Sequence, residues 1–301
     1  MPAEESGASH ADGVRGERPA HGPAVTGFAV LLVLAAAAMH ATWNAMLRSH
    51  GDRLWSITVM SLASTLGALP AFLLLPSVAG AAWPYIGLSA SLHVGYSLVL
   101  VQAYRHGDFL QVYPIARGSA PLLVTLGAAL LAGERPSAAA LAGIALVSLG
   151  ILSLARPAAG AKPASLAYAL LTGVFIACYT VSDGIGSRLS GDALAYAARL
   201  FLLYGAAMPA VFLALRRPDR HVKLRDAISP LIGGIVSMLA YGLVIWAMSL
   251  SPLGPVAALR ETSVVFATLI GRLFLREALT LRRAGAALVI AAGAVCLGLA
   301  A

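Results

Sequence analysis

Ten long apolar stretches, separated by short polar connections, occupy most of this 301-residue sequence. An α-helix needs about 20 apolar residues to cross the hydrocarbon core of a bilayer. The sequence therefore predicts an all-α integral membrane protein with ten transmembrane helices. These helices are expected at residues 26–47, 54–76, 83–104, 109–132, 137–155, 164–187, 193–215, 227–250, 254–275 and 284–300.

The composition excludes a soluble globular domain. Hydrophobic residues make up 59% of the chain and charged residues only 11%, whereas a soluble domain carries about a quarter charged residues. The net charge of +8 points to loops beside lipid headgroups, and no motif indicates a nucleic-acid partner. Cys178 and Cys296 lie inside apolar stretches, which favours packing roles over a disulfide or a metal site.

The chain divides into three predicted parts, a tail followed by two five-helix units. Residues 1–25 are rich in Gly, Ala and Pro without periodicity, so we expect a disordered tail. The first apolar stretch ends in Ala41-Thr-Trp-Asn44 rather than at a small-residue cleavage site, which favours a transmembrane helix over a signal peptide. The remainder divides into a five-helix unit at 26–155 and a second one at 164–300.

An internal repeat links these two units. Residues 104–155 align without gaps with residues 247–298, so that Arg117 matches Arg260 and Glu134 matches Glu277. Because five helices is an odd number, the second unit enters the membrane in the opposite orientation. Inverted repeats are typical of secondary transporters, whose substrate site lies near the midplane between the repeats.

The predicted location is the plasma (inner) membrane, with both termini on the same side. The connections opposite the termini carry most of the Lys and Arg residues, including the stretch 216–225. By the positive-inside bias, that side would be cytoplasmic. The basic stretch itself is expected to be an interfacial topology anchor.

Over nearly all of 26–300, the sequence resembles the EamA-type, ten-helix branch of the drug/metabolite transporter superfamily. The resemblance rests on His40-Ala-Thr-Trp-Asn44 at the end of the first helix and on an acidic turn before a short Gly-rich helix in both halves. Those turns read Gly133-Glu-Arg135 and Arg276-Glu-Ala278.

The resemblance implies transport of a small metabolite, often export, by alternating access driven by an ion or substrate gradient. It also implies cytoplasmic termini, which disagrees with the charge bias. Small multidrug exporters of the superfamily carry a glutamate in their first helix, where this chain has His40 and Asn44. A proton-coupled mechanism for cationic drugs is therefore not carried over.

Ionisable residues within membrane helices are functional candidates, because they are costly unless paired or hydrated. Arg117 and Arg260 are expected near mid-membrane, where two guanidinium groups would suit a carboxylate or phosphate. The alternative is an internal bridge from one arginine to Glu261 or Asp183. The full set is His40, His93, Arg117, Asp183, Arg199, Arg260 and Glu261.

Polar and aromatic residues at helical spacing are expected to line the same cavity, on helices 1, 3, 4, 6, 8 and 9. Interfacial positions are the alternative for the individual aromatic residues. The predicted substrate-binding residues are His40, Trp43, Asn44, His93, Tyr96, Tyr113, Arg117, Tyr179, Tyr241 and Arg260. The coupling candidates are His40, Asp183 and Glu261, although Asp183 lies near a helix end where it could meet only headgroups or water.

The repeated glutamates, Glu134 and Glu277, are interpreted as turn residues that complement the positive start of a helix. Gly143, Gly150, Gly285 and Gly293 favour close packing of the short fifth and tenth helices against each other.

Other classes of function have weaker support. No nucleophile motif, metal set or phosphate loop indicates an enzyme or an ATP-driven pump, and we expect no cofactor and no metal. An integral membrane enzyme and a flippase for a lipid-linked substrate stay open as alternatives. The expected partners are a small-molecule substrate, a coupling proton or other ion and the lipid bilayer, and a homodimer stays open.

Overall fold

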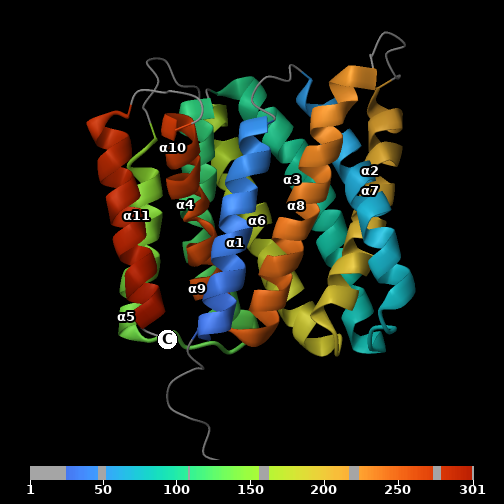
Figure 1. Cartoon of the computed structure of the whole chain (residues 1–301), viewed down its shortest axis with the longest axis horizontal. Helices are drawn as coiled ribbons and strands as arrows, with labels where there is room; N and C mark the ends of the chain where they lie inside the picture. The colour runs from blue at the N-terminus through green and yellow to red at the C-terminus, as the bar shows by residue number, and fades with distance from the viewer. Residues whose placement is uncertain are drawn as a thin grey trace, which may run out of the picture.

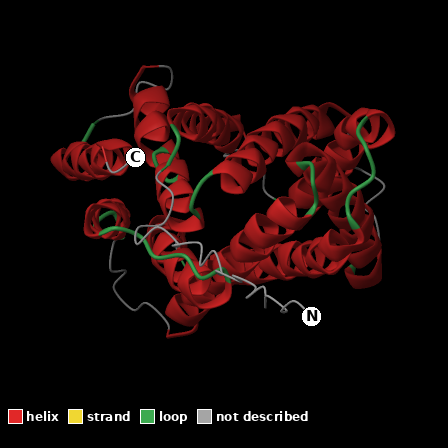
Figure 2. Cartoon of the chain, turned by 90° about the horizontal axis from the view of Figure 1, so that it is seen from below, coloured by secondary structure: helices red, strands yellow, loops and turns green. Residues whose placement is uncertain are grey.

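The computed structural model describes residues 25–46, 52–107, 109–155, 163–216, 224–273 and 279–299, and these residues are helical apart from short turns (Figure 2). Residues 1–24 of the predicted tail, the turn around Glu277 and most of the basic stretch 216–225 lie outside the described residues.

The helices match the predicted stretches closely. The first half contains α1 (Gly27–Met46), α2 (Arg53–Leu74), η1 (Gly80–Ala82), α3 (Trp83–His106), α4 (Phe109–Leu131) and α5 (Ala138–Leu152). The second half contains α6 (Pro163–Leu189), α7 (Ala193–Leu215), α8 (Leu224–Leu250), α9 (Leu253–Arg260), α10 (Ser263–Leu273) and α11 (Leu281–Leu299). Counting α9 and α10 as one span, the described residues hold nine spans long and apolar enough to cross a membrane, and the shorter apolar helix α5.

Polar residues at the helix starts explain where several helices begin. Asp52, Ser137 and Asp192 each accept a hydrogen bond from the backbone N–H three residues later, at the starts of α2, α5 and α7. Such caps satisfy backbone donors that the helix itself leaves without a partner. The helices therefore begin where the apolar pattern and a capping side chain coincide.

The two halves are packed as inverted repeats. Thr26 before α1 bonds Ser251 at the end of α8, and Arg188 near the end of α6 bonds Met248 in the last turn of α8, so α1 and α6 run in opposite directions. The packing of α3 on α6 has its counterpart in α8 on α1, and α4 on α6 in α9 and α10 on α1. Helices α2 and α5 pack on their own counterparts, α7 and α11. Figure 1 shows α1 beginning and α11 ending at the same end of the bundle.

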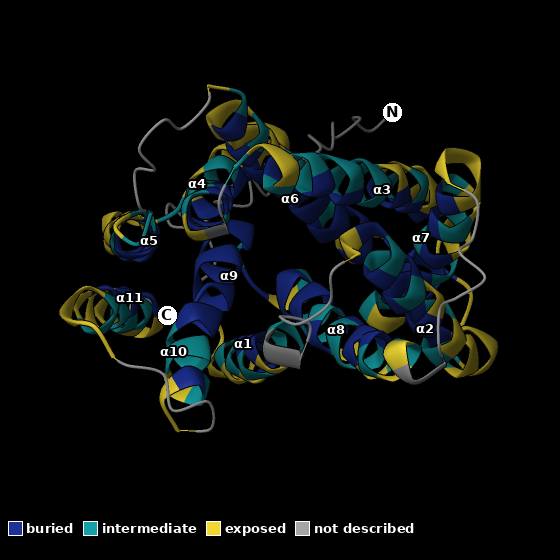
Figure 3. Cartoon of the chain, turned by 90° about the horizontal axis from the view of Figure 1, so that it is seen from above, coloured by how far each residue is buried: buried dark blue, intermediate teal, exposed yellow. Residues whose placement is uncertain are grey.

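Exposed apolar side chains cover the outside of the bundle, as expected for a surface that faces lipid. Most are leucines, such as Leu130 and Leu288, which are more than 70% exposed. Helix α9 is the opposite case, because all eight of its residues are buried (Figure 3). The interior is thus organised around α9 and the helices next to it.

The predicted close packing of the short helices is confirmed, with one exception. A Cβ atom added to Gly143 would lie 2.9 Å from the Gly293 carbonyl oxygen, and one added to Gly293 would lie 2.8 Å from the Gly143 carbonyl. Gly150 of α5 likewise faces Ile290 of α11. The expectation is wrong for Gly285, where a Cβ would have no neighbour within 4 Å.

The predicted ninth span at 254–275 is present as Leu253–Leu273, but its helix is broken between Arg260 and Ser263, which the sequence did not predict. The N–H groups of Glu261 and Thr262 bond carbonyls three residues back, at 3.0 and 3.1 Å, instead of four. This tighter turn ends α9, and α10 begins at Ser263. Hydropathy could not show the break, because both halves are apolar.

Candidate functional site

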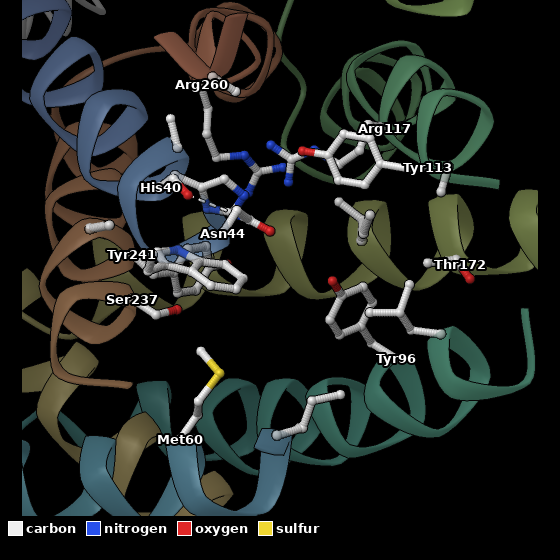
Figure 4. A pocket seen from close by; sticks show the side chains of 18 of the residues that line it. His40, Asn44, Met60, Tyr96, Tyr113, Arg117, Thr172, Ser237, Tyr241 and Arg260 are labelled. Carbon is white, nitrogen blue, oxygen red and sulfur yellow. Dashed lines mark hydrogen bonds between the residues drawn. The ribbon is translucent and has the colours of Figure 1, made fainter. Parts of the chain in front are cut away.

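A large cavity of about 780 Å³ lies between the two repeats. All ten residues predicted to bind substrate contribute to its wall, and Figure 4 shows several of them pointing into it. They come from α1, α3, α4, α6, α8 and α9, as expected. These ten residues are His40, Trp43, Asn44, His93, Tyr96, Tyr113, Arg117, Tyr179, Tyr241 and Arg260.

The wall also includes helices outside the predicted set. Helix α2 contributes Ser61 and Ser64, and α7 contributes Phe201 and Tyr204. The signal for α2 was a set of Ser and Thr residues recurring along one face of an apolar helix. The signal for Tyr204 was its position in the middle of a helix rather than near an end, where interfacial aromatic residues lie.

The cavity reaches the end of the bundle that lies opposite the termini. Its wall includes Arg53 at the start of α2, Tyr104 in the last turn of α3, and Thr280 and Arg283 around the start of α11. We call this the open end. Within the described part of the chain, the wall contains no residue from the α4–α5, α6–α7 or α8–α9 turns at the other end.

A network of polar contacts joins the repeats at that other end, the closed end. The Arg188 Nη2 group donates to Glu134 Oε1 at 2.8 Å and to the Ser251 carbonyl at 2.8 Å. Glu134 Oε2 accepts a bond from the Leu253 backbone N–H, also at 2.8 Å. A carboxylate at a helix N-terminus is favoured by the helix dipole. The closed end therefore holds a contact between the first repeat and the start of α9.

This geometry corrects the interpretation of Glu134. The sequence predicted that it complements the helix that follows it, but Ser137 caps α5 and the Glu134 side chain reaches α9 of the other repeat. The sequence did predict that the carboxylate interacts with a helix start. It could not predict that this helix is α9, because Glu134 and Leu253 lie 119 positions apart and such a contact leaves no local pattern.

Two arginines and one glutamate form a charged cluster at the cavity wall. Arg117 Nε lies 2.8 Å from Glu261 Oε2, although its N–H does not point along that line. Arg260 Nε lies 3.5 Å from Glu261 Oε1. All three side chains are almost fully buried. Two positive charges and one negative charge leave a net charge of +1 beside the cavity.

The two arginines reach this cluster from opposite repeats. In Figure 4, Arg117 extends from α4 and Arg260 from α9, and their guanidinium groups lie next to each other. The repeat alignment explains their matched depth, but it places Gly118 opposite Glu261. Only the second repeat supplies a carboxylate to this cluster. Both arginines contact Glu261, as the alternative of an internal bridge predicts, and both also line the cavity, where their contact with substrate stays a prediction.

Aromatic rings form a second part of the cavity wall. His93 stacks on Tyr179 with ring centroids 4.0 Å apart, and Tyr204 and Tyr241 each lie 5.5 Å from His93. Tyr96 packs edge-on against Tyr179 at 5.7 Å. These rings come from α3, α6, α7 and α8, so the aromatic group joins both repeats.

The end of α1 and the start of α4 complete the wall. His40 packs edge-on against Trp43 with centroids 4.9 Å apart, and the Asn44 amide donates to the His40 carbonyl at 2.8 Å. The Trp43 Nε1 atom is buried without a hydrogen-bond partner among the described residues. Tyr113 lies beside Arg117, whose guanidinium carbon is 5.9 Å from the centre of the tyrosine ring.

Asp183 is buried next to the cavity, on its closed-end side. Its side chain has no exposed surface, so the expectation that it could meet only headgroups or water is wrong. The hydroxyl of Tyr196 donates to Oδ1 at 3.0 Å and the hydroxyl of Tyr241 to Oδ2 at 2.6 Å. Of the coupling candidates, His40 lines the cavity, whereas Glu261 and Asp183 lie behind its wall.

The remaining candidates have other surroundings. Arg199 bonds the carbonyls of Ala195 and Pro76, both at 2.9 Å, and is absent from the cavity wall. Cys178 is exposed on α6, which contradicts a packing role, and Cys296 is partly buried. Among the described residues, no three His, Cys, Asp or Glu side chains are placed to hold a metal ion.

The fold defines a multi-pass membrane protein with a large cavity between its two repeats. Residues 164–299 match the EamA-like transporter family, so the second repeat is an EamA-like transporter domain and the resemblance is confirmed. That match supports a membrane transporter of the drug/metabolite type. No curated protein matches the sequence.

Several solved structures match this chain, and one of them shares the fold along nearly the whole chain. That structure, named "Crystal structure of protein", is 19% identical and superposes with a TM-score of 0.72. The alignment covers 90% of this chain and 96% of that chain. At this identity the likeness concerns the fold alone.

Proposed function

We propose that this protein is a secondary transporter that exports a small polar or amphipathic metabolite by alternating access, and that Arg117 and Arg260 bind an anionic group of the substrate. The observation that carries the proposal is the cavity between the repeats, with two arginines at its wall and a single glutamate behind them. Export is the direction that the family resemblance implies.

The charge of the cluster supports an anionic group. Glu261 balances one of the two guanidinium groups, so a carboxylate or phosphate entering the cavity would balance the other. Guanidinium groups bind such oxygens through two parallel hydrogen bonds. The aromatic group around His93 offers an apolar surface to the rest of the substrate, as small-molecule sites commonly do.

The two ends of the cavity support alternating access. The cavity reaches the open end, while Glu134 and Arg188 hold the repeats together at the closed end. In transporters with inverted repeats, the two halves rock around a central site and open each end in turn. Breaking the contact of Glu134 with Leu253 would be part of that motion.

A thermal-shift panel in detergent tests the binding site. The probes are carboxylates, sugar phosphates and neutral analogues of each, applied to the wild type, Arg117→Ala and Arg260→Ala. At 100 times its dissociation constant, a ligand adds about 2.7 kcal/mol to the free energy of unfolding. We expect an anionic probe to stabilise the wild type and neither arginine variant.

Arg199→Ala is the matched control, because Arg199 is also a buried membrane arginine but lies outside the cavity. This variant should lose stability and keep the full ligand shift. Equal shifts in all four proteins would show that Arg117 and Arg260 are structural, and the preference for anions would then be abandoned.

A further inference from the structure

Asp183 and Glu261 are both buried carboxylates, but they differ in whether a positively charged side chain lies beside them. Glu261 lies within 3.5 Å of two guanidinium groups, whereas no ion pair among the described residues involves Asp183. Its hydrogen bonds come from the uncharged hydroxyls of Tyr196 and Tyr241. A fully buried carboxylate without a cationic partner is costly in the ionised form. Binding a proton removes that cost.

A polar path joins Asp183 to the cavity. His93 lines the cavity, and its Nδ1 lies 2.9 Å from the Ser89 carbonyl and 3.2 Å from the Ser89 hydroxyl. Because the carbonyl can only accept, Nδ1 carries the proton in this arrangement. The Ser89 hydroxyl is then free to donate, and its interaction with the Asp183 carboxylate extends the path toward that group.

Asp183 also lies beside the elements that close the cavity. The next residue, Gly184, lets the Leu253 side chain pack directly on α6, where any Cβ would overlap it. The backbone N–H of Leu253 is the group held by Glu134. Tyr196 and Tyr241 connect the carboxylate to α7 and α8. A change of charge at Asp183 thus acts on several helices of the closed end.

The other titratable groups around Asp183 come from every helix packed near it. They are His93 on α3, Tyr179 on α6 itself, Tyr196 on α7, Tyr241 on α8 and Arg260 on α9. Arg260 is the permanent cation in this set; its charge acts on Asp183 without contact. Its near neighbour is Glu261, at 3.5 Å.

We propose that Asp183 is the proton-binding site of this transporter, loaded from the cavity through His93 and Ser89 and linked to the closed end by Tyr196 and Tyr241. Hydronium in the cavity gives a proton to His93 Nε2 and becomes water, Nδ1 releases its proton to the Ser89 hydroxyl oxygen, and Ser89 passes its original hydroxyl proton to Asp183. One proton moves in total. The carboxylic acid accepts weaker hydrogen bonds than the carboxylate, so protonation loosens the hold of Tyr196 and Tyr241 and favours opening of the closed end.

Infrared difference spectroscopy of the protein reconstituted in lipid tests the proton site. Acidification in the absence of any substrate should produce the C=O stretching band of a buried carboxylic acid. We expect Asp183→Asn to lose this band and Asp226→Asn, which changes an exposed aspartate at the start of α8, to keep it. A band that survives in Asp183→Asn, or that the wild type lacks, would overturn the proposal, as would a response to sodium in place of protons.

A second variant covers the case in which Asp183→Asn does not fold. Tyr241→Phe keeps the carboxyl group and removes its shortest hydrogen bond, so the band should persist at a higher frequency. An unchanged frequency would contradict the assignment to Asp183.

The link to the closed end is tested with Ser190→Cys in a background where Cys178 and Cys296 are alanine. Ser190 is 3% exposed and lies in the turn between α6 and α7. A maleimide reacts with the thiolate, so labelling by a water-soluble maleimide is expressed relative to that of the unfolded protein at the same pH. This ratio should rise on acidification, and Asp183→Asn should keep the raised ratio at every pH. A ratio that does not change with pH in the wild-type background would overturn the link.

This inference rests on the proposed transport function, but its experiments use no substrate. Failure of the arginine panel would therefore leave the proton site standing, and failure of the infrared test would leave the anion site standing.

Discussion

Arg117 and Arg260 occupy matched positions in the two repeats, yet the chain continues differently after each. Helix α4 runs on through Gly118, and α9 ends at Arg260, where Glu261 begins a two-residue break. The break places the Glu261 carboxylate between both arginines. Each repeat thus supplies one guanidinium group to the cluster, whereas the carboxylate that balances their charge comes from the second repeat only.

Removing the shared carboxylate should have the largest effect. Glu261→Gln leaves two buried guanidinium groups without a counter-charge, and breaking a buried ion pair costs about 3 kcal/mol or more. We expect the lowest detergent melting temperature of the variants in this comparison. The matched control is Glu134→Gln, since that side chain is 13% exposed and the amide oxygen can still accept from Leu253.

Adding Arg117→Gln to Glu261→Gln should restore part of the lost stability, because the double variant regains the original net charge of the cluster. A double variant that is less stable than both single variants would show that charge balance is not what Glu261 provides.

An intermediate effect is expected at the matched position in the first repeat. A Cβ at Gly118 would lie 2.7 Å from Leu152 Cγ and 3.2 Å from the Leu152 backbone nitrogen, so Gly118→Ala should push α5 from α4. Such overpacking costs about 1–3 kcal/mol, measurable by thermal unfolding. Gly87→Ala is the control, because a Cβ there meets nothing within 4 Å and alanine favours the helix. If both variants unfold alike, the close approach at Gly118 is not limiting.

The smallest effect should come from Ser263→Ala. The Arg117 Nη2 group donates to Ser263 Oγ at 3.4 Å, a long bond for which we expect a loss of no more than about 0.5 kcal/mol. Thermal unfolding should place this variant near the wild type, with the same shift from an anionic probe. A loss as large as that of Glu261→Gln would mean that Ser263, and not the carboxylate, holds Arg117 in place.

The cavity wall was largely predictable, whereas the contacts behind it were not. Helical spacing and the cost of buried charge identified Arg117, Arg260 and the aromatic residues as neighbours of one cavity, and their role in binding stays a prediction. The same reasoning could not show that Asp183 meets Tyr196 and Tyr241, because the three residues lie on three helices. The spacing of residues along one helix shows which of them share a face, but it does not show which residues of another helix that face contacts.

The ten apolar stretches, their limits to within a few residues, and the repeat that makes the halves inverted could all be predicted from the sequence. Membrane helices can be predicted from local hydropathy. The orientation of the second repeat relative to the first follows from the odd number of helices in each repeat. The sequence could not show that Glu134 reaches α9, that the ninth span breaks at Glu261, or that one end of the cavity is closed. These features depend on contacts between helices far apart in the chain. Such contacts are set by how the helices pack and by how buried charges are balanced, and neither can be read from a local stretch of sequence.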